Sequence, residues 1–258
     1  MLELPAAEIT AWIGRYLWPL FRVTAFLMAM PVIGTQLIPM RIRLGLGVLI
    51  TLAIAPLLPE MPRIEGLSLA AYLLIGQQIL IGVAMAFVLQ LLFQVFVLAG
   101  QMMAMQMGLG FASMVDPVNG VNVAVLSQFY LMLVTLLFLA MNGHIVAIEV
   151  LVESFHTMPV ALLSFDAVLL WQLVNWSVWM FAAAMLVALP AVTAILVVNF
   201  AFGIMNRAAP QLNVFSLGFP FTMVFGLLIV FISLAGFLPQ FQGLTEQAIM
   251  LLRQFVGA

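Results

Sequence analysis

Long stretches without a charged side chain restrict most strongly what this chain can fold into. Residues 66–115 and residues 167–206 contain no Asp, Glu, Lys or Arg. An α-helix needs about 20 mostly apolar residues to cross a bilayer, whereas transmembrane strands show alternating polarity over about ten residues. No such alternation is found in this sequence. The pattern therefore predicts an all-α, membrane-associated fold.

The uncharged stretches predict about six hydrophobic helical units, several of them long enough to bend or to form hairpins. The arginines around them give no consistent orientation. By the positive-inside rule Arg41, Arg43 and Arg207 mark one side of the membrane, and Arg63 and Arg253 then fall on the other side. The expected units are residues 23–40, which Pro31 and Pro39 break, 44–59, 66–115, 117–148, 167–206 and 208–245.

Composition excludes several classes of function. The chain is only 6% charged, whereas a soluble domain is about 25% charged, and its net charge of −2 gives no support for nucleic-acid binding. Without Cys there is no thiolate chemistry. Without Lys there is no Walker A motif, so any energy must come from partners or the membrane potential. Because Glu3 and Glu8 precede the first Arg, we expect a mature N-terminus rather than a signal peptide.

Glutamines are unusually frequent in the long apolar stretch of residues 66–115. At about 100° per residue, Gln90, Gln94 and Gln101 fall within about 40° of one another on one helix face. Amide side chains in apolar surroundings must find hydrogen-bond partners. We therefore expect this helix to be buried against other helices or other chains, with these three residues at a subunit interface.

Small residues recur every four positions near the end of the same stretch. They are Gly100, Ala104, Gly108 and Ala112, and this spacing lets helix backbones approach closely. Two interpretations remain open, which are packing within the chain and contact with a partner subunit.

Residues 100–120 read "GQMMAMQMGLGFASMVDPVNG" and combine clustered methionines with turn signals. Gly108 and Gly110 loosen the backbone, and Asp116-Pro117 is a turn dipeptide. The pattern predicts a helix that runs out into a loop of about a dozen residues lined with Met and Phe. Such a loop either gates a pore by excluding water or merely connects two helices.

Arg22 and two histidines are the candidate sites for chemistry. An ionisable residue within a hydrophobic unit is a functional candidate. Since Arg does not release its proton, we favour a structural pairing of Arg22 with a carboxylate or a backbone carbonyl of a neighbouring chain. Glu153 and His156 have the Glu-x-x-His spacing of di-iron bundles, but those need a second such pair, and His144 has none. No catalytic residue, metal or cofactor is predicted.

A polar segment separates the last two apolar units. Arg207 ends an uncharged run, Pro210 breaks the helix, and Gln211 and Asn213 offer hydrogen-bonding groups. We expect Pro220 in the first turn of the following helix. The segment therefore predicts an elbow between two helices of a hairpin, which serves either as a plain turn or as a recognition surface.

Three stretches of this sequence resemble the FliR (SctT) family of type III export gates, and together they extend over most of the chain. The resemblance favours the flagellar branch of the family over the virulence injectisome. The stretches are "RVTAFLMAMPVIGTQLIPMRIRLGLGVLITLAIAP", residues 100–120 followed by "LSQFYLMLVTLLFLAMNGH", and "RAAPQLNVFSLGFP".

The resemblance implies a subunit that assembles with FliP and FliQ into a helical gate, next to FlhB and FlhA. Unfolded flagellar proteins pass through that gate, driven by partner ATPase activity and the proton motive force. It also implies kinked hairpins in a pseudo-helical hetero-oligomer, with residues 1–164 similar to FliP and residues 165–258 similar to FliQ. The expected location is the bacterial inner membrane, where the protein is multi-pass and its assembled complex lies partly on the periplasmic side.

The resemblance also implies roles for particular residues. The loop after the long helix, about residues 108–122, is expected to plug the closed channel, with Phe111 and Met114 facing the pore. The full set expected in this plug is Met107, Gly108, Gly110, Phe111, Met114, Asp116 and Pro117. The full set expected at subunit interfaces is Gln90, Gln94, Gln101, Arg207, Pro210, Gln211 and Asn213.

Two other classes of protein compete with the export gate. A small-solute secondary transporter has internal repeats and ionisable residues at mid-membrane, and only Arg22 fits that description here. An intramembrane enzyme needs a nucleophile with a base or a metal site, and the sequence contains neither pattern. An export-gate subunit is expected to form a stable hetero-oligomer, whereas a transporter is expected to purify as one chain or a homodimer.

Overall fold

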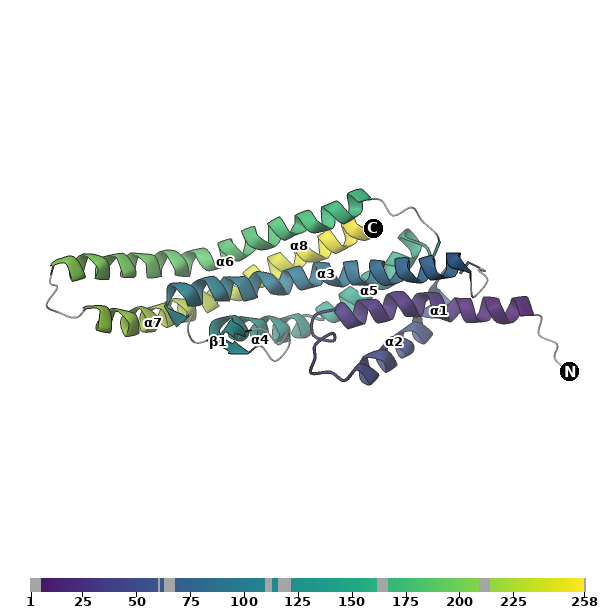
Figure 1. Cartoon of the computed structure of the whole chain (residues 1–258), viewed down its shortest axis with the longest axis horizontal. Helices are drawn as coiled ribbons and strands as arrows, with labels where there is room; N and C mark the ends of the chain where they lie inside the picture. Colours follow the sequence, from purple (N-terminus) through teal and green to yellow (C-terminus); the bar gives the residue numbers. More distant parts are fainter. Residues whose placement is uncertain are drawn as a thin grey trace. The chain divides into compact units, whose positions relative to one another are not determined.

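The computed structural model describes residues 6–59, 61–62, 68–109, 113–115, 122–161, 167–208 and 214–257. The predicted all-α class is confirmed, with one short strand pair in addition (Figure 1). In chain order the elements are α1 (Ala6–Ala29), α2 (Met40–Ile54), η1 (Ala55–Leu57), α3 (Leu69–Gln106), β1 (Ser113–Val115), β2 (Asn122–Ala124), α4 (Val125–Ala140), α5 (Gly143–Thr157), α6 (Ala167–Ala208), α7 (Val214–Ser233), η3 (Leu234–Gly236) and α8 (Phe237–Val256).

Some predicted helix limits are wrong, because charged residues do not end helices here. Helix α1 extends on both sides of Arg22, whereas its end at Ala29 and the start of α2 after Pro39 agree with the predicted breaks. Asn142, whose φ of 59° is left-handed, separates α4 from α5, and the two helices are bent by 67°. Pro220 lies inside α7 rather than in its first turn, since that helix already begins at Val214.

Several of these helices are long and apolar enough to span a membrane. Among the described residues there are four, and up to five if the bent α4–α5 pair makes one span. These helices differ sharply in burial. In α3, 67% of the most apolar stretch of 18 residues is buried, whereas in the span Leu169–Ala208 only 28% of the corresponding stretch is buried. Most of the apolar stretch of α3 is therefore packed inside the chain, whereas α6 leaves more apolar side chains for lipid or other chains to cover.

The chain forms two compact units that interleave in sequence. The first comprises Met1–Gln90, Leu139–Trp176 and Ala248–Ala258, and the second comprises Leu91–Phe138 and Ser177–Gln247. Helices α3, α6 and α8 thus contribute residues to both units.

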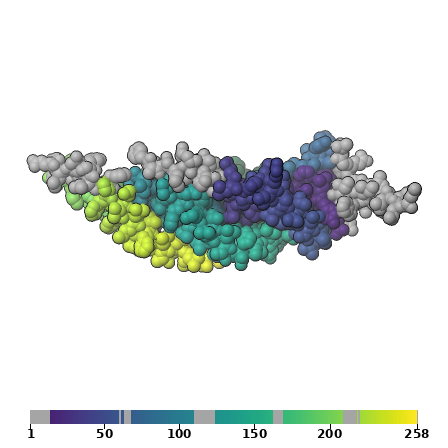
Figure 2. Space-filling model, turned by 90° about the horizontal axis from the view of Figure 1, so that it is seen from below, coloured from purple at the N-terminus to yellow at the C-terminus, as the bar shows by residue number. Residues whose placement is uncertain are grey.

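In the first unit α1 packs closely on α2 and α3. A Cβ added at Gly47 of α2 would lie 2.6 Å from Cγ2 of Thr24 on α1. A Cβ added at Gly82 of α3 would overlap the backbone oxygen of Arg22. The outer side of α2 exposes apolar side chains, among them Ile42 and Leu49, and contributes to the face seen in Figure 2.

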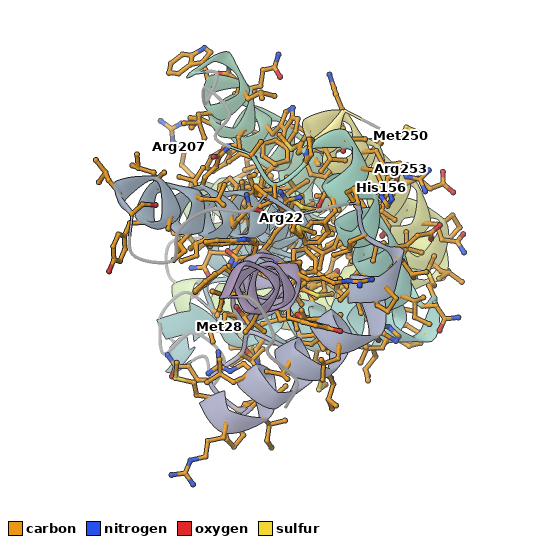
Figure 3. The ribbon with its side chains drawn as sticks, turned by 90° about the vertical axis from the view of Figure 1, so that its right-hand side faces the viewer. Arg22, Met28, His156, Arg207, Met250 and Arg253 are labelled. Carbon is orange, nitrogen blue, oxygen red and sulfur yellow. The ribbon has the colours of Figure 1, made fainter. Side chains whose placement is uncertain are left out.

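Arg22, labelled in Figure 3, is fully buried within the first unit. Its Nε donates to Oε1 of Gln78 at 2.8 Å, its Nη1 donates to the carbonyl oxygen of Ser154 at 2.8 Å, and its Nη2 donates to that of Met158 at 2.8 Å. The guanidinium also lies 4.2 Å from the ring centroid of Phe155. Arg22 thus pairs structurally, but the expected partner was wrong: the acceptors are an amide and backbone carbonyls of its own chain rather than groups of a neighbouring chain.

The two carbonyls that bind Arg22 lie at the C-terminal end of α5. The negative end of the helix dipole is located there, and it stabilises a cation in place of a carboxylate. Burial lowers the pKa of Arg22 to about 9, so the guanidinium remains protonated at neutral pH. Arg22 therefore fastens α1, α3 and the end of α5 together.

The second unit is held by an aromatic cluster between α3, α4 and the start of α8. Phe96 contacts Phe237 at 5.3 Å and Phe241 at 5.7 Å between ring centroids. Tyr130 contacts Phe237 at 5.5 Å, and Phe93 contacts Phe138 at 5.3 Å. Tilted and edge-to-face pairs at such distances add to the free energy gained by burial.

Candidate functional site

The methionine-rich end of α3 turns sharply after its last helical residue. The amide of Met107 donates to the carbonyl of Met103 at 3.0 Å, and that of Gly108 donates to the carbonyl of Met105 at 3.1 Å. Gly108 has a φ of +75°, a left-handed conformation that only glycine adopts without strain. The helix therefore ends at a defined point and the chain changes direction at Gly108.

The segment that leaves α3 returns as a paired hairpin. Strands β1 and β2 are antiparallel, with Ser113 opposite Ala124 and Val115 opposite Asn122. The sequence predicted a loop here, and the structure adds that its two arms bind each other through their backbones. Residues 110–112 and 116–121 lie outside the described residues.

The returning arm is joined to α3 by a set of contacts that we call the neck, formed by Val97, Gly100, Gln101, Ala124 and Ser127. The amide of Ala124 donates to Oε1 of Gln101 at 3.1 Å. The hydroxyl of Ser127 donates to the carbonyl of Val97 at 2.9 Å. A Cβ added at Gly100 would lie 2.7 Å from Cα of Ser127, so the two backbones meet directly at the neck.

Met107 is seated against α7 beyond the end of α3. It is fully buried, and a Cβ added at Gly226 would lie 2.6 Å from its Cγ. Helix α6 also holds this end of α3, because Nδ2 of Asn199 donates to the carbonyl of Gln106 at 3.3 Å. Figure 1 shows this end of α3 beside α7.

A cavity of about 380 Å³ adjoins Met107. Its wall is partly apolar, from Met105 and Phe202, and partly polar, from Asn199 and Asn206. Phe202 contacts Phe221 at 5.6 Å between ring centroids, which fastens α6 to α7 beside the cavity. The described part of the site is thus the end of α3, held by α6 and α7, together with the strand pair that leaves it and returns to it.

The structure brings only some of the predicted site residues together. Met107 and Gly108 form the exit from α3, and Met114 lies in β1. Gln101 binds within its own chain, whereas Gln94 is exposed. The predicted residues outside the described part of the chain are Gly110, Phe111, Asp116, Pro117, Pro210, Gln211 and Asn213.

The other predicted interface residues lie at the surface. Nε2 of Gln90 donates to the carbonyl of Ala29 at 2.6 Å, and the residue is exposed. Arg207 is exposed in the last turn of α6 (Figure 3).

The sequence did not single out Asn199, Gly226 or Ser127. Asn199 could have been noticed as one of the few polar residues in the run 167–206. Gly226 belongs to no pattern, and its partner Met107 is far away in sequence. Within the described ranges, no three or more His, Asp or Glu side chains are grouped so as to hold a metal ion.

Comparison with known proteins identifies relatives along most of the chain. The family described as "Bacterial export proteins, family 1" matches residues 13–248. The flagellar biosynthetic protein FliR of Escherichia coli K12 is 39% identical over 227 residues, which cover 88% of this chain and 87% of the relative. FliR of Pectobacterium carotovorum is 37% identical over 228 residues, with the same coverage. FliR of Bacillus subtilis is 24% identical over 223 residues, which cover 85% of this chain and 86% of the relative.

Proposed function

Because this chain belongs to family 1 of the bacterial export proteins and functions in flagellar protein export, we propose that it is a core subunit of the flagellar type III export gate. In this proposal it forms a channel with FliP and FliQ, through which unfolded flagellar proteins are secreted. Family membership points to a structural component of export rather than to an enzyme.

The exposed apolar surface of the second unit supports an assembled gate. Phe200 on α6 and Phe231 on α7 are 71% and 74% exposed, and such side chains require lipid or protein around them. We assign this surface to FliP, FliQ and the surrounding lipid, with FlhB and FlhA as further neighbours. The complex then lies in the inner membrane and partly on its periplasmic side.

The same proposal divides the chain into two parts with different roles. Residues 1–164 act as the part similar to FliP, and residues 165–258 act as the part similar to FliQ. The elbow with Arg207, Pro210, Gln211 and Asn213 contacts neighbouring subunits, as do Gln90, Gln94 and Gln101. Support comes from the exposure of Arg207, Gln90 and Gln94 in the isolated chain.

The observation that most supports gating is that both ends of the hairpin are attached to α3. The chain leaves α3 at the Gly108 turn and comes back at the neck through Ala124. We call the residues between these points, 108–124, the plug segment. Its two ends are attached to one helix, and in this proposal the residues between them close the pore. Phe111 and Met114 are proposed to face that pore.

We expect the variant with Phe111→Ala and Met114→Ala to leak ions. Removing two large apolar side chains lowers the barrier that an apolar constriction imposes by excluding water. Membrane conductance of cells that assemble the variant gate should rise at least several-fold over wild type. Met250→Ala is the matched control, because Met250 is an exposed methionine on α8. Unchanged conductance in the double variant would count against the plug.

A further inference from the structure

The cavity of about 380 Å³ beside the end of α3 is large enough to hold a ligand, because ligand sites in proteins commonly measure about 300–1,000 Å³. Residues of α3, α6 and α7 and of the turn after α3 line it, and all of them belong to the second unit. No charged side chain is among the described residues of its wall. Burying an unpaired charge there is unfavourable, so the cavity favours a neutral ligand.

Helix α6 contributes four residues of the wall from one of its faces. Asn199, Phe202, Gly203 and Asn206 line the cavity, and their spacing of three, four and seven residues places them on the same side of the helix. The two asparagines are separated by about 10 Å along the helix axis. About three residues of extended polypeptide have this length.

Two side-chain amides of the cavity wall are without a hydrogen-bond partner. Asn199 donates from Nδ2 to the carbonyl of Gln106, but the side chains of Gln106 and Asn206 are half-buried and bind no group in the described part of the chain. A carboxamide offers two N–H donors and an accepting oxygen. A hydrocarbon chain in the cavity would leave these groups unpaired, which is unfavourable, whereas a peptide backbone can pair with both kinds of group.

Glycines keep two sides of the cavity free of side chains. A Cβ added at Gly203 of α6 has nothing within 4 Å, and one added at Gly218 of α7 would lie 3.8 Å from the ring of Phe202. Packing within the chain therefore does not require a glycine at either position. Glycines in regular elements often mark places where a ligand or another backbone approaches closely.

Methionines form the part of the wall that comes from α3. Met105 is exposed and Met107 is buried. The methionine side chain is unbranched and adaptable, so it can repack around ligands of different shape. Carboxamides that bind a backbone, beside methionines that adapt to side chains, suit polypeptides of varied sequence better than one fixed partner segment.

We propose that this cavity binds about three residues of extended, uncharged polypeptide, and that its occupant is the unfolded protein in transit through the gate. Gln106 and Asn206 pair with backbone amides of that polypeptide, and Phe202 and Met105 contact its side chains. Acidic and basic stretches bind more weakly, because the cavity wall offers them no opposite charge. This inference rests on the proposed function as an export gate, and it names the feature of the exported protein that this site recognises.

Photo-cross-linking of the purified full-length chain tests the site. With p-benzoylphenylalanine in place of Met105, the chain in detergent is illuminated with a biotinylated octapeptide of Gly, Ser and Asn, or with one of Glu alone. We expect at least five-fold more adduct with the neutral peptide. Asn206→Leu has nearly the same volume but no hydrogen-bonding group, and it should lower that adduct at least five-fold. Gln242→Leu is the matched control, because Gln242 is an exposed amide of α8 outside the cavity wall, and it should change nothing. Equal labelling by both peptides, or no effect of Asn206→Leu, would overturn the proposal.

The same cross-linker in living cells identifies the occupant. An exported flagellar protein fused to a tightly folded domain stops in the gate, and it should be cross-linked at least five-fold more than the same protein without that domain. Adducts with FliP or FliQ alone would show that a neighbouring subunit fills the cavity, and an absence of protein adducts would show that only water or lipid does. Either result would overturn the proposal. Peptide binding by the purified chain does not require a gate, so failure of the proposed function is recognised separately, by purification of the chain without FliP and FliQ.

Filling the cavity provides a test of its use in export. Gly203→Leu should reduce export at least several-fold while the amounts of FliP and FliQ that purify with the chain stay the same. Val197→Leu adds volume to an exposed position of α6 outside the cavity wall, and it should leave export unchanged. Asn206→Leu needs no additional space and should also reduce export, so the test does not depend on the filled variant alone. Normal export in both Gly203→Leu and Asn206→Leu would contradict the proposal.

Discussion

Arg22→Met should destabilise the protein severely, by about 3–5 kcal/mol, as is found when one partner of a buried charged network is removed. The substitution preserves much of the apolar stem but leaves Oε1 of Gln78 and the carbonyls of Ser154 and Met158 without their donor. Gln78 and Ser154 are buried and Met158 is half-buried, so each loses a hydrogen bond in a site with little water, although the carbonyl of Ser154 still accepts from the amide of Met158. Thermal unfolding in detergent and the amount of protein in the membrane both measure the effect.

Two further variants separate charge from geometry at this position. Arg15→Met removes the same charge from the same helix at an exposed position, and we expect a change within about 0.5 kcal/mol. Arg22→Lys keeps the charge but cannot reproduce the planar fork of donors, so its stability should fall between the two. The assignment of Arg22 as the fastening of α1, α3 and α5 would be wrong if Arg22→Met were as stable as Arg15→Met.

Gly100→Ala should destabilise the second unit by about 1–3 kcal/mol, the usual effect of overpacking. The new Cβ would lie 2.7 Å from Cα and 2.9 Å from N of Ser127. Since these are backbone atoms, no side-chain rotation relieves the contact, and α3 must move away from the start of α4. That movement also weakens the bonds of Gln101 and Ser127 at the neck.

A substitution on the same helix provides the control with the opposite expected sign. Gly76→Ala meets nothing within 4 Å, so it should stabilise α3 by up to about 1 kcal/mol through helix propensity. Protease sensitivity of the plug segment and the unfolding midpoint measure both variants. A stabilising Gly100→Ala would show that the backbones do not meet at the neck.

The sequence predicted best those helices whose limits depend on local signals. The predicted unit 167–206 differs from α6 by only two residues, because the helix is uniformly apolar and a proline follows it closely. The start of α1 was missed because Arg22 was treated as a boundary. That residue can be buried only because carbonyls from residues 154 and 158 surround it, and pairing over such a separation leaves no local pattern.

The sequence predicted only part of the candidate site, because contacts between residues distant in sequence leave no local pattern. Gly108 and the clustered methionines predicted the end of a helix and a loop after it. The helical face shared by Gln90, Gln94 and Gln101 indicated polar partners, but periodicity does not distinguish a partner chain from the same chain. For Gln101 the oxygen accepts from Ala124 of the same chain. The seat of Met107 on Gly226 depends on a tertiary contact alone.

The mass and composition of the purified particle test the central claim most directly. The chain would be produced together with FliP and FliQ, extracted in detergent and analysed by native mass spectrometry. The account predicts one defined hetero-oligomer that contains all three proteins, and loss of that particle when Arg22→Met is introduced. A lone chain or a homodimer, obtained while FliP and FliQ remain together without it, would contradict the account and favour a small-solute transporter.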